Sequence, residues 1–235
     1  MKKFLYGLFL ILCLGLFTGA EFEGEWGGAG ACSESDTFTY ANGILPTVGS
    51  ALWEAIDADG GDVASNEWKE NASHADQYVT SGIKSSVCDF ADDQYAEIDL
   101  HDCAAIDNDY VGVVVRAVDG GNPLTSSDYY FCVYAYWDDA SLSYFYIGQV
   151  DNDTHTYFTQ AATYAGQISD GDVLRLEVTT NGSDADLVCK LNGSTLTNGS
   201  QTDSTSAFTG GQPGVTYYRG NISATAGDDF SAGDL

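Results

Sequence analysis

Tyrosines, carboxylates and arginines alternate with apolar residues in several short segments of this chain, and side chains of these types can bind sugars. In residues 94–100, Tyr95, Glu97 and Asp99 fall on one side of an extended chain, with small or aliphatic residues on the other. Aromatic rings stack on sugar rings, while carboxylates and guanidinium groups hydrogen bond to hydroxyls. The side chains that this alternation places on polar faces, and that we predict to form a glycan-binding face if their segments share one sheet, are Tyr95, Glu97, Arg116, Tyr130, Tyr134, Tyr136 and Arg175.

The segments that carry these residues have the length and composition of β-strands. Each is rich in β-branched and aromatic residues and has turn-forming residues at its ends. Asn192-Gly193 is typical of a tight hairpin turn. Since no helical periodicity follows residue 20, we predict an all-β sandwich or jelly roll. The predicted strands are residues 93–100, 110–118, 129–137, 143–150, 155–160, 172–179 and 186–191.

The two ends of the predicted domain carry similar elements. Asp36-Thr37-Phe38 begins the first strand, and Asp228-Asp229-Phe230 ends the last. In a sandwich whose terminal strands pair, both phenylalanines point into one core. The aspartates then meet outside that core.

The order of these motifs resembles the concanavalin A-like lectin/glucanase (laminin-G-like) jelly-roll superfamily over about residues 36 to 231. The matching stretches are D36-T-F38, N42-G43, W53, D93-Q-Y-A-E-I-D-L100, V111-G-V-V-V-R-A117, G171-D-V-L-R-L-E-V178, G211-Q-P-G-V215 and D228-D-F230. The resemblance implies a two-sheet antiparallel jelly-roll sandwich. It also implies glycan binding on the concave sheet.

Several members of this superfamily bind one structural Ca²⁺ where the terminal strands meet. The resemblance therefore implies a Ca²⁺ site with carboxylate ligands from Asp36 and from Asp228 or Asp229. Simple capping of strand ends by aspartate is the alternative interpretation of these three residues.

One segment raises an enzymatic alternative. Glu97-Ile98-Asp99-Leu100-His101-Asp102 is similar to the E-I-D-x-E or E-I-D-x-x-E strand of laminarinase- and lichenase-type glycoside hydrolases. The similarity implies Glu97 as nucleophile and Asp99 as the group that tunes its protonation. The chain departs from the pattern at the acid/base position, where His101 and the shorter Asp102 stand in place of glutamate.

The N-terminal segment has the pattern of a secretory signal peptide. A basic start is followed by an apolar run and by Thr18-Gly19-Ala20, which predicts cleavage before Glu21. Residues 21–35 are rich in Gly and Glu and are expected to be a flexible leader, with the jelly-roll domain spanning 36–235. An uncleaved membrane anchor is the alternative interpretation of the first twenty residues.

Secretion permits disulfides, and five cysteines remain after cleavage. Because five is odd, at least one thiol is free or pairs with another chain, which would favour self-assembly. Six N-x-S/T sequons mark sites for glycosylation in a host that has this modification.

The formal net charge of −27 repels phosphate backbones, so nucleic acids and anionic membranes are disfavoured as partners. We interpret the chain as a secreted, non-catalytic module for recognition of a glycan or for assembly of an extracellular surface. The alternatives are a retaining glycoside hydrolase that uses Glu97, and a purely structural subunit of a surface layer, filament or virion.

Overall fold

The computed structural model describes residues 31–57, 62–64, 67–69, 78–101, 109–118, 127–136, 142–152, 154–165, 168–219 and 226–235. These residues belong to one unit, Ala31–Leu235, and form β-strands with one short helix, α2 (Leu45–Val48), among them. The predicted signal peptide lies outside the described residues. None of the helices in the described part of the chain is long and apolar enough to span a membrane.

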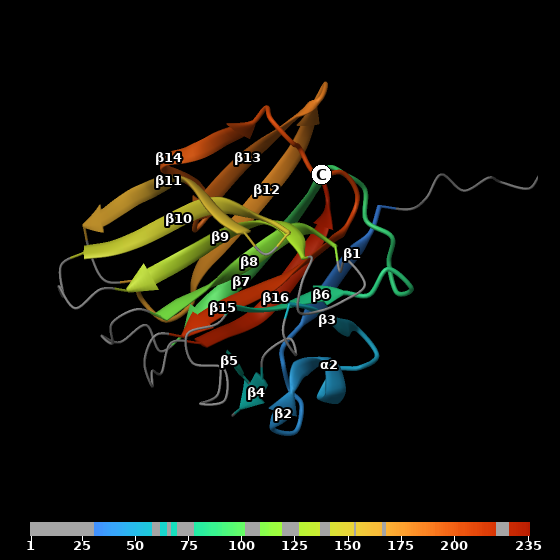
Figure 1. The fold of residues 1–235 in the computed structure, drawn as a ribbon. Coiled ribbons are helices and arrows are strands. Elements are labelled where there is room, and N and C mark those ends of the chain that lie inside the picture. The colour runs from blue at the N-terminus through green and yellow to red at the C-terminus, as the bar shows by residue number, and fades with distance from the viewer. Residues whose placement is uncertain are drawn as a thin grey trace, which may run out of the picture. The chain divides into compact units, whose positions relative to one another are not determined.

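The strands form two antiparallel sheets that lie face to face (Figure 1). In spatial order, sheet A consists of β14 (Ser194–Asp203), β13 (Asp184–Leu191), β12 (Asp172–Asn181), β7 (Gln94–His101), β16 (Ala226–Asp234), β5 (Glu67–Lys69), β4 (Asp62–Ala64) and β2 (Gly43–Ile44), with β1 (Ser33–Asp36) also paired to β16. Sheet B consists of β11 (Thr154–Ala165), β10 (Leu142–Asp151), β9 (Asp128–Tyr136), β8 (Asp109–Val118), β15 (Gln212–Arg219), β6 (Tyr78–Ile83) and β3 (Trp53–Asp57). The two sheets confirm the predicted all-β sandwich.

Alternating apolar side chains of sheet A form one wall of the core between the sheets. Along β7, Ala96, Ile98 and Leu100 are fully buried, while the residues between them are half-buried on the outer face. The same alternation holds in β12, where Leu174 and Leu176 point inward. These two strands confirm the predicted polar and apolar faces.

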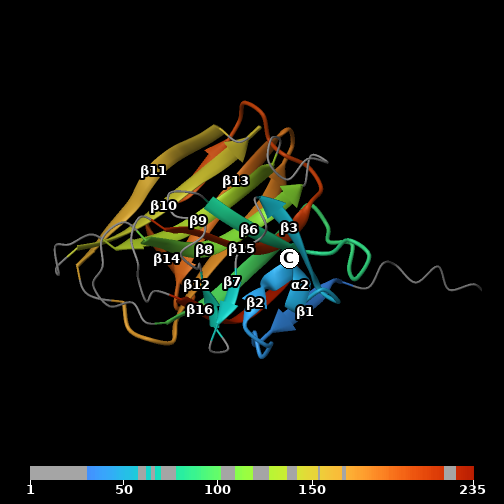
Figure 2. The ribbon, with the colours of Figure 1, turned by 60° about the horizontal axis from the view of Figure 1, so that its bottom comes forward.

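The two chain ends meet in an aromatic cluster. β1 pairs with β16 so that Asp36 lies opposite Phe230, which places the C-terminus beside β1 (Figure 2). Phe38 and Phe230 are both buried, with Trp53 between them at ring-centroid distances of 5.7 and 4.9 Å. The prediction that both phenylalanines enter one core is confirmed.

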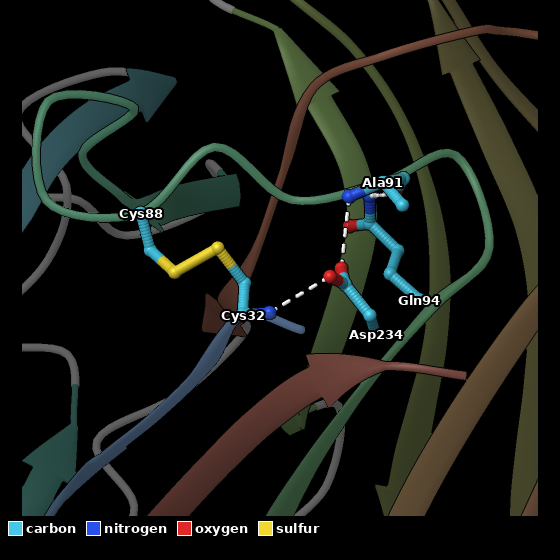
Figure 3. Close-up of a disulfide and its surroundings, with 5 residues drawn as sticks. All are labelled: Cys32, Cys88, Ala91, Gln94 and Asp234. Atoms are coloured by element: carbon cyan, nitrogen blue, oxygen red, sulfur yellow. Dashed lines mark hydrogen bonds between the residues drawn. A yellow bond between two sulfur atoms is a disulfide. The ribbon is translucent and has the colours of Figure 1, made fainter. Parts of the chain in front are cut away.

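The ordered domain begins earlier than the sequence predicted. β1 starts at Ser33, and Cys32 forms a disulfide with Cys88. Asp234 accepts hydrogen bonds from the backbone N–H groups of Cys32 and Ala91, each at 2.8 Å (Figure 3). The predicted flexible leader over 21–35 was therefore wrong at its C-terminal end, because a disulfide and the last strand hold these residues.

A second disulfide, Cys132–Cys189, joins β9 of sheet B to β13 of sheet A across the core. Its two cysteines are fully buried, whereas Cys32 and Cys88 are only partly buried. Cys103, the fifth cysteine of the predicted mature chain, lies outside the described residues.

Replacing each disulfide by a pair of alanines should separate two contributions to the free energy of unfolding: the lower entropy of the crosslinked unfolded chain and the packing of the sulfur atoms in the core. The sequence separations are 57 and 56 residues, so each loss of a crosslink should cost a similar amount, about 2–4 kcal/mol. We expect C132A/C189A to lose more than C32A/C88A in urea unfolding, because it also removes two buried sulfur atoms. Equal losses would show that the buried sulfurs add nothing beyond the crosslink.

Candidate functional site

Three of the seven predicted glycan-binding residues lie together on the outer face of sheet A. The Arg175 guanidinium bonds to Glu97 on β7 (Nη1–Oε2, 3.1 Å) and to Glu177 on its own strand (Nε–Oε1, 2.8 Å). Lys190 of β13 donates to the other oxygen of Glu177 at 2.7 Å. The strand register sets up these contacts, since Arg175 stands opposite Glu97 on one side and Lys190 on the other. These partly exposed pairs are worth at most about 1 kcal/mol each.

The Tyr95 ring is already engaged within this network. The Arg175 guanidinium carbon lies 3.6 Å from the ring centroid, in a cation–π contact. The ring also fills the space above Gly233, where a β-carbon would lie 2.7 Å from Tyr95 Cε1. A sugar could stack on this ring only after displacing the guanidinium.

A small pocket lies beside this network, at the junction of β1, β16 and β7. Its volume is about 280 Å³, and its lining is dominated by hydroxyl groups. The lining residues are Ser33, Glu34, Ser35, Tyr95, Ser231 and Ala232. It is a second place on sheet A where a small polar ligand could bind.

Glu97, the nucleophile of the hydrolase alternative, is already bonded to other side chains. Ser231 donates to Glu97 Oε1 at 2.7 Å, and Arg175 holds Oε2, so both oxygens of the predicted nucleophile are bonded. Asp99 lies on the same face of β7, as predicted. Burial, followed by the charge of Asp229, raises the pKa of Asp99. Asp102, the predicted acid/base, lies outside the described residues.

The predicted calcium ligands do not fit a metal site. Asp36 Oδ1 accepts the Phe38 N–H at 2.8 Å, and its Oδ2 accepts the Tyr40 hydroxyl at 2.7 Å together with the indole N–H of Trp53. Hydrogen-bond donors thus surround the carboxylate where a cation would need free oxygens. Asp36 closes the turn after β1.

The other two predicted ligands belong to a different environment. Asp228 stands opposite Asp99 in the β16–β7 register, and the charges of Asp228 and Asp229 both act on Asp99. Within the described part of the chain, no group of three or more His, Cys, Asp or Glu side chains is arranged to hold a metal ion.

Tyr130 and Tyr134 were predicted to be exposed, and this was wrong. Both are fully buried between the sheets. The Tyr130 hydroxyl donates to Asp203 at 2.8 Å and accepts the Phe208 N–H at 3.0 Å. Burial, together with the hydrogen bond to Asp203, raises the pKa of Tyr130. The side chain of Tyr136 lies outside the described residues.

Cys132 explains why these tyrosines face inward. It lies between Tyr130 and Tyr134 on the same side of β9, and its disulfide to sheet A requires that side to face the core. The sequence holds only half of this signal: Cys189 alternates with Leu187 and Leu191 as a core residue does, but nothing in the sequence pairs it with Cys132.

Arg116 was also predicted to lie on the exposed face and is instead buried. A bulge in β8 gives this residue a φ of 52° and turns its side chain toward sheet A. The guanidinium donates to the Asp92 and Phe208 carbonyls at 2.8 and 2.6 Å and to Thr180 Oγ1 at 2.8 Å. Burial lowers the pKa of Arg116, opposed by the charge of Asp92.

The sequence analysis missed a row of aromatic side chains on the outer face of sheet B. Tyr110 lies 5.9 Å from Tyr146, Tyr146 lies 5.3 Å from Tyr157, and Tyr157 lies 5.7 Å from Phe131, all between ring centroids. Tyr144 extends the row at 6.5 Å from Tyr146. We call these five residues, Tyr110, Phe131, Tyr144, Tyr146 and Tyr157, the aromatic ladder.

The aromatic ladder combines a buried base with an exposed end. Phe131 belongs to a second apolar cluster with Val114, Val133 and Val150, on the side of sheet B that faces away from sheet A. Tyr157, on the edge strand β11, is 46% exposed. The ladder therefore presents aromatic surface that is held in place by packing beneath it.

Comparison with known proteins supports the fold. Neither a protein-family model nor a curated protein sequence matches the chain. Among solved structures, the potassium-bound carbohydrate recognition domain of Emp46p aligns with a TM-score of 0.52 at 7% identity, covering 83% of this chain and 93% of that domain.

The chain has a concanavalin A-like jelly-roll fold. Two other solved structures give lower TM-scores. The carbohydrate-binding module CBM66 from Bacillus subtilis has a TM-score of 0.40 at 13% identity, covering 77% of this chain and 91% of that one. LamAcat from Zobellia galactanivorans also gives 0.40 at 13% identity, covering 86% and 94%.

Removal of the Arg116 guanidinium should destabilise the jelly roll strongly. Arg116→Met keeps most of the aliphatic stem but leaves the partly buried acceptors of Asp92, Phe208 and Thr180 without their donor, at a cost of about 1 kcal/mol for each, or about 3 kcal/mol together. Arg175→Met, in the partly exposed network, is the matched control and should cost at most about 1 kcal/mol. Urea unfolding of both variants measures the difference, and similar losses would contradict the structural role of Arg116.

Neutralising Asp99 should stabilise the protein in a pH-dependent way. Because the pKa of Asp99 is raised in the folded state, its ionised form disfavours folding at pH values above that raised pKa. The penalty is absent below the ordinary pKa of aspartate, where both states are protonated. Asp99→Asn should therefore melt above the wild type at pH 7, with a gap that closes as the pH falls toward 3.

Asp170→Asn, in an exposed turn, controls for the loss of one negative charge from an acidic protein. A gap of the same size in this control, or one that persists at pH 3, would contradict the prediction for Asp99.

Proposed function

We propose that this protein recognises carbohydrate outside the cell through the aromatic ladder on sheet B. The observation that carries the proposal is the continuous row from Tyr110 through Tyr146 to the exposed Tyr157. Aromatic faces of this kind contact the apolar C–H faces of sugar rings, and the phenol hydroxyls can bond to sugar hydroxyls. The likeness in fold to a carbohydrate recognition domain is consistent with this role.

Rigidity of the ladder favours binding. Phe131 and its neighbours are packed in the second apolar cluster, so the rings above them lose little conformational freedom when a ligand arrives. The ladder also spans β8, β9, β10 and β11, a run of strands that suits an extended polymer better than a single sugar.

An extracellular role rests on the predicted signal peptide and on the two disulfides, which form and persist in oxidising compartments. The hydrolase alternative has less support, because Ser231 and Arg175 occupy both oxygens of Glu97. Surface assembly has no described contact that favours it over sugar binding.

Truncation of the exposed ring should weaken binding without unfolding the protein. Tyr157→Ala removes the most exposed ring of the ladder, and loss of an aromatic residue that dominates an interface costs about 2 kcal/mol, or roughly thirtyfold in affinity. Affinity gel electrophoresis with soluble polysaccharides and pull-down with insoluble ones measure the effect.

Tyr95→Ala on the outer face of sheet A is the matched control, since it removes a partly exposed tyrosine from the opposite sheet. Its binding should equal that of the wild type. If Tyr95→Ala lost binding and Tyr157→Ala kept it, the site would lie on sheet A instead.

A further inference from the structure

The rings of the aromatic ladder are inclined to one another. The ring plane of Tyr146 makes angles of 53° with that of Tyr110 and 59° with that of Tyr157. Tyr144 is more nearly parallel to Tyr146, at 27°, since both project from the same side of β10. A flat surface that lay along these two rings would not contact the face of Tyr157, the most exposed ring of the ladder.

The inclination between Tyr146 and Tyr157 has a cause in the backbone. The pairing of β10 with β11 shifts register between Phe145 and Tyr146, and again between Ile147 and Gly148, which stands opposite Tyr157. Irregularities of this kind bend a strand and increase its local twist. Side chains that are neighbours across the two strands therefore point in different directions.

A buried ring holds Tyr157 at its angle. Phe131, which is 1% exposed, meets the Tyr157 ring at 83° with 5.7 Å between centroids, in the T-shaped arrangement that aromatic pairs favour. Phe131 itself packs over Gly148, where a β-carbon would lie 2.5 Å from Phe131 Cζ. Turning Tyr157 to lie parallel with Tyr146 would break its contact with a ring that is fixed in the second apolar cluster.

We propose that the aromatic ladder binds individual, twisted polysaccharide chains in preference to the flat faces of crystalline polysaccharides. This inference rests on the proposed function and adds the physical form of the ligand. Successive sugar units of a chain in solution rotate about their glycosidic bonds, so their apolar faces can meet rings that are inclined to one another. Chains in a crystal hold these faces in one plane, which can stack on Tyr146 or on Tyr157 but not on both.

The test compares polysaccharides that share their chemistry and differ in physical form. Cellulose, chitin, mannan, β-1,3-glucan and amylose are each prepared in a crystalline form and as soluble chains with the same linkage. Calorimetry gives the dissociation constant of the full-length protein for the soluble chains, and depletion isotherms give it for the crystalline forms. Tyr157→Ala and Tyr95→Ala are measured in parallel.

We expect at least one soluble chain to bind, with an affinity that falls in Tyr157→Ala and stays the same in Tyr95→Ala. Its crystalline form should bind more weakly by about tenfold or more, because neighbouring rings cannot stack on it together. Equal or tighter binding of the crystalline form, lost in Tyr157→Ala, would overturn this inference and leave carbohydrate recognition by the ladder intact. Failure of every polymer to bind in either form, or binding that survives Tyr157→Ala, would remove the proposed site and this inference with it.

Phe131→Leu tests whether the angle of Tyr157 is the source of the preference. Leucine keeps an apolar side chain in the second apolar cluster but removes the ring that Tyr157 meets edge-on. The ratio of soluble to crystalline affinity should then fall toward one, because Tyr157 is free to turn. An unchanged ratio in a variant that melts cooperatively would contradict the inference, and if the variant does not fold, the comparison of the two forms with the wild type decides.

Discussion

The buried guanidinium of Arg116 is the interaction on which the arrangement of the two sheets depends. It lies between a strand of sheet B and three acceptors from other parts of the chain: the carbonyls before β7 and before β15, and a hydroxyl near the end of β12. A buried cation without such acceptors would be strongly unfavourable, so the bulge that turns Arg116 inward is retained despite its positive φ. The same contacts fix the loop that carries Phe208 over Tyr130.

This arrangement gives the two outer faces different properties. On sheet A, the half-buried side chains satisfy one another, because Glu97, Arg175, Glu177 and Lys190 form a continuous set of ion pairs and Arg175 covers Tyr95. On sheet B, the inward rotation of Tyr130, Cys132 and Tyr134 leaves Phe131 and Val133 on the other side. There Phe131 belongs to the aromatic ladder, and Val133 lies in the apolar cluster on which the ladder packs. The outer face of sheet A, whose polar residues the sequence analysis singled out, is thus the face on which those polar groups are already paired with one another.

The disulfides and the contacts between the chain ends both help to hold the two large sheets together. Cys132–Cys189 crosses the core, and Cys32–Cys88 ties the first strand to the loop before β7. Asp234 joins that loop to the N-terminal strand through two backbone N–H groups. Because the first and last strands are neighbours, these local contacts close the chain at the place where it would otherwise fray.

The sequence by itself determined the fold class and the faces of β7 and β12. In those strands one set of alternating residues is apolar and the other is charged, so only one orientation buries no charge. It also determined that Phe38 and Phe230 share a core. The sequence could not orient β9, because Tyr130, Cys132 and Tyr134 are as compatible with burial as Phe131 and Val133. Only the tertiary structure decided that question, through the disulfide to Cys189 and the hydrogen bond from Tyr130 to Asp203. The position of Arg116 was equally inaccessible, since a bulge breaks the alternation of β8 and its acceptors come from segments distant in the chain. The aromatic ladder depends on the orientation of β9 and on the course of β8, because tyrosines from separate strands become neighbours only when the register and orientation of sheet B are fixed.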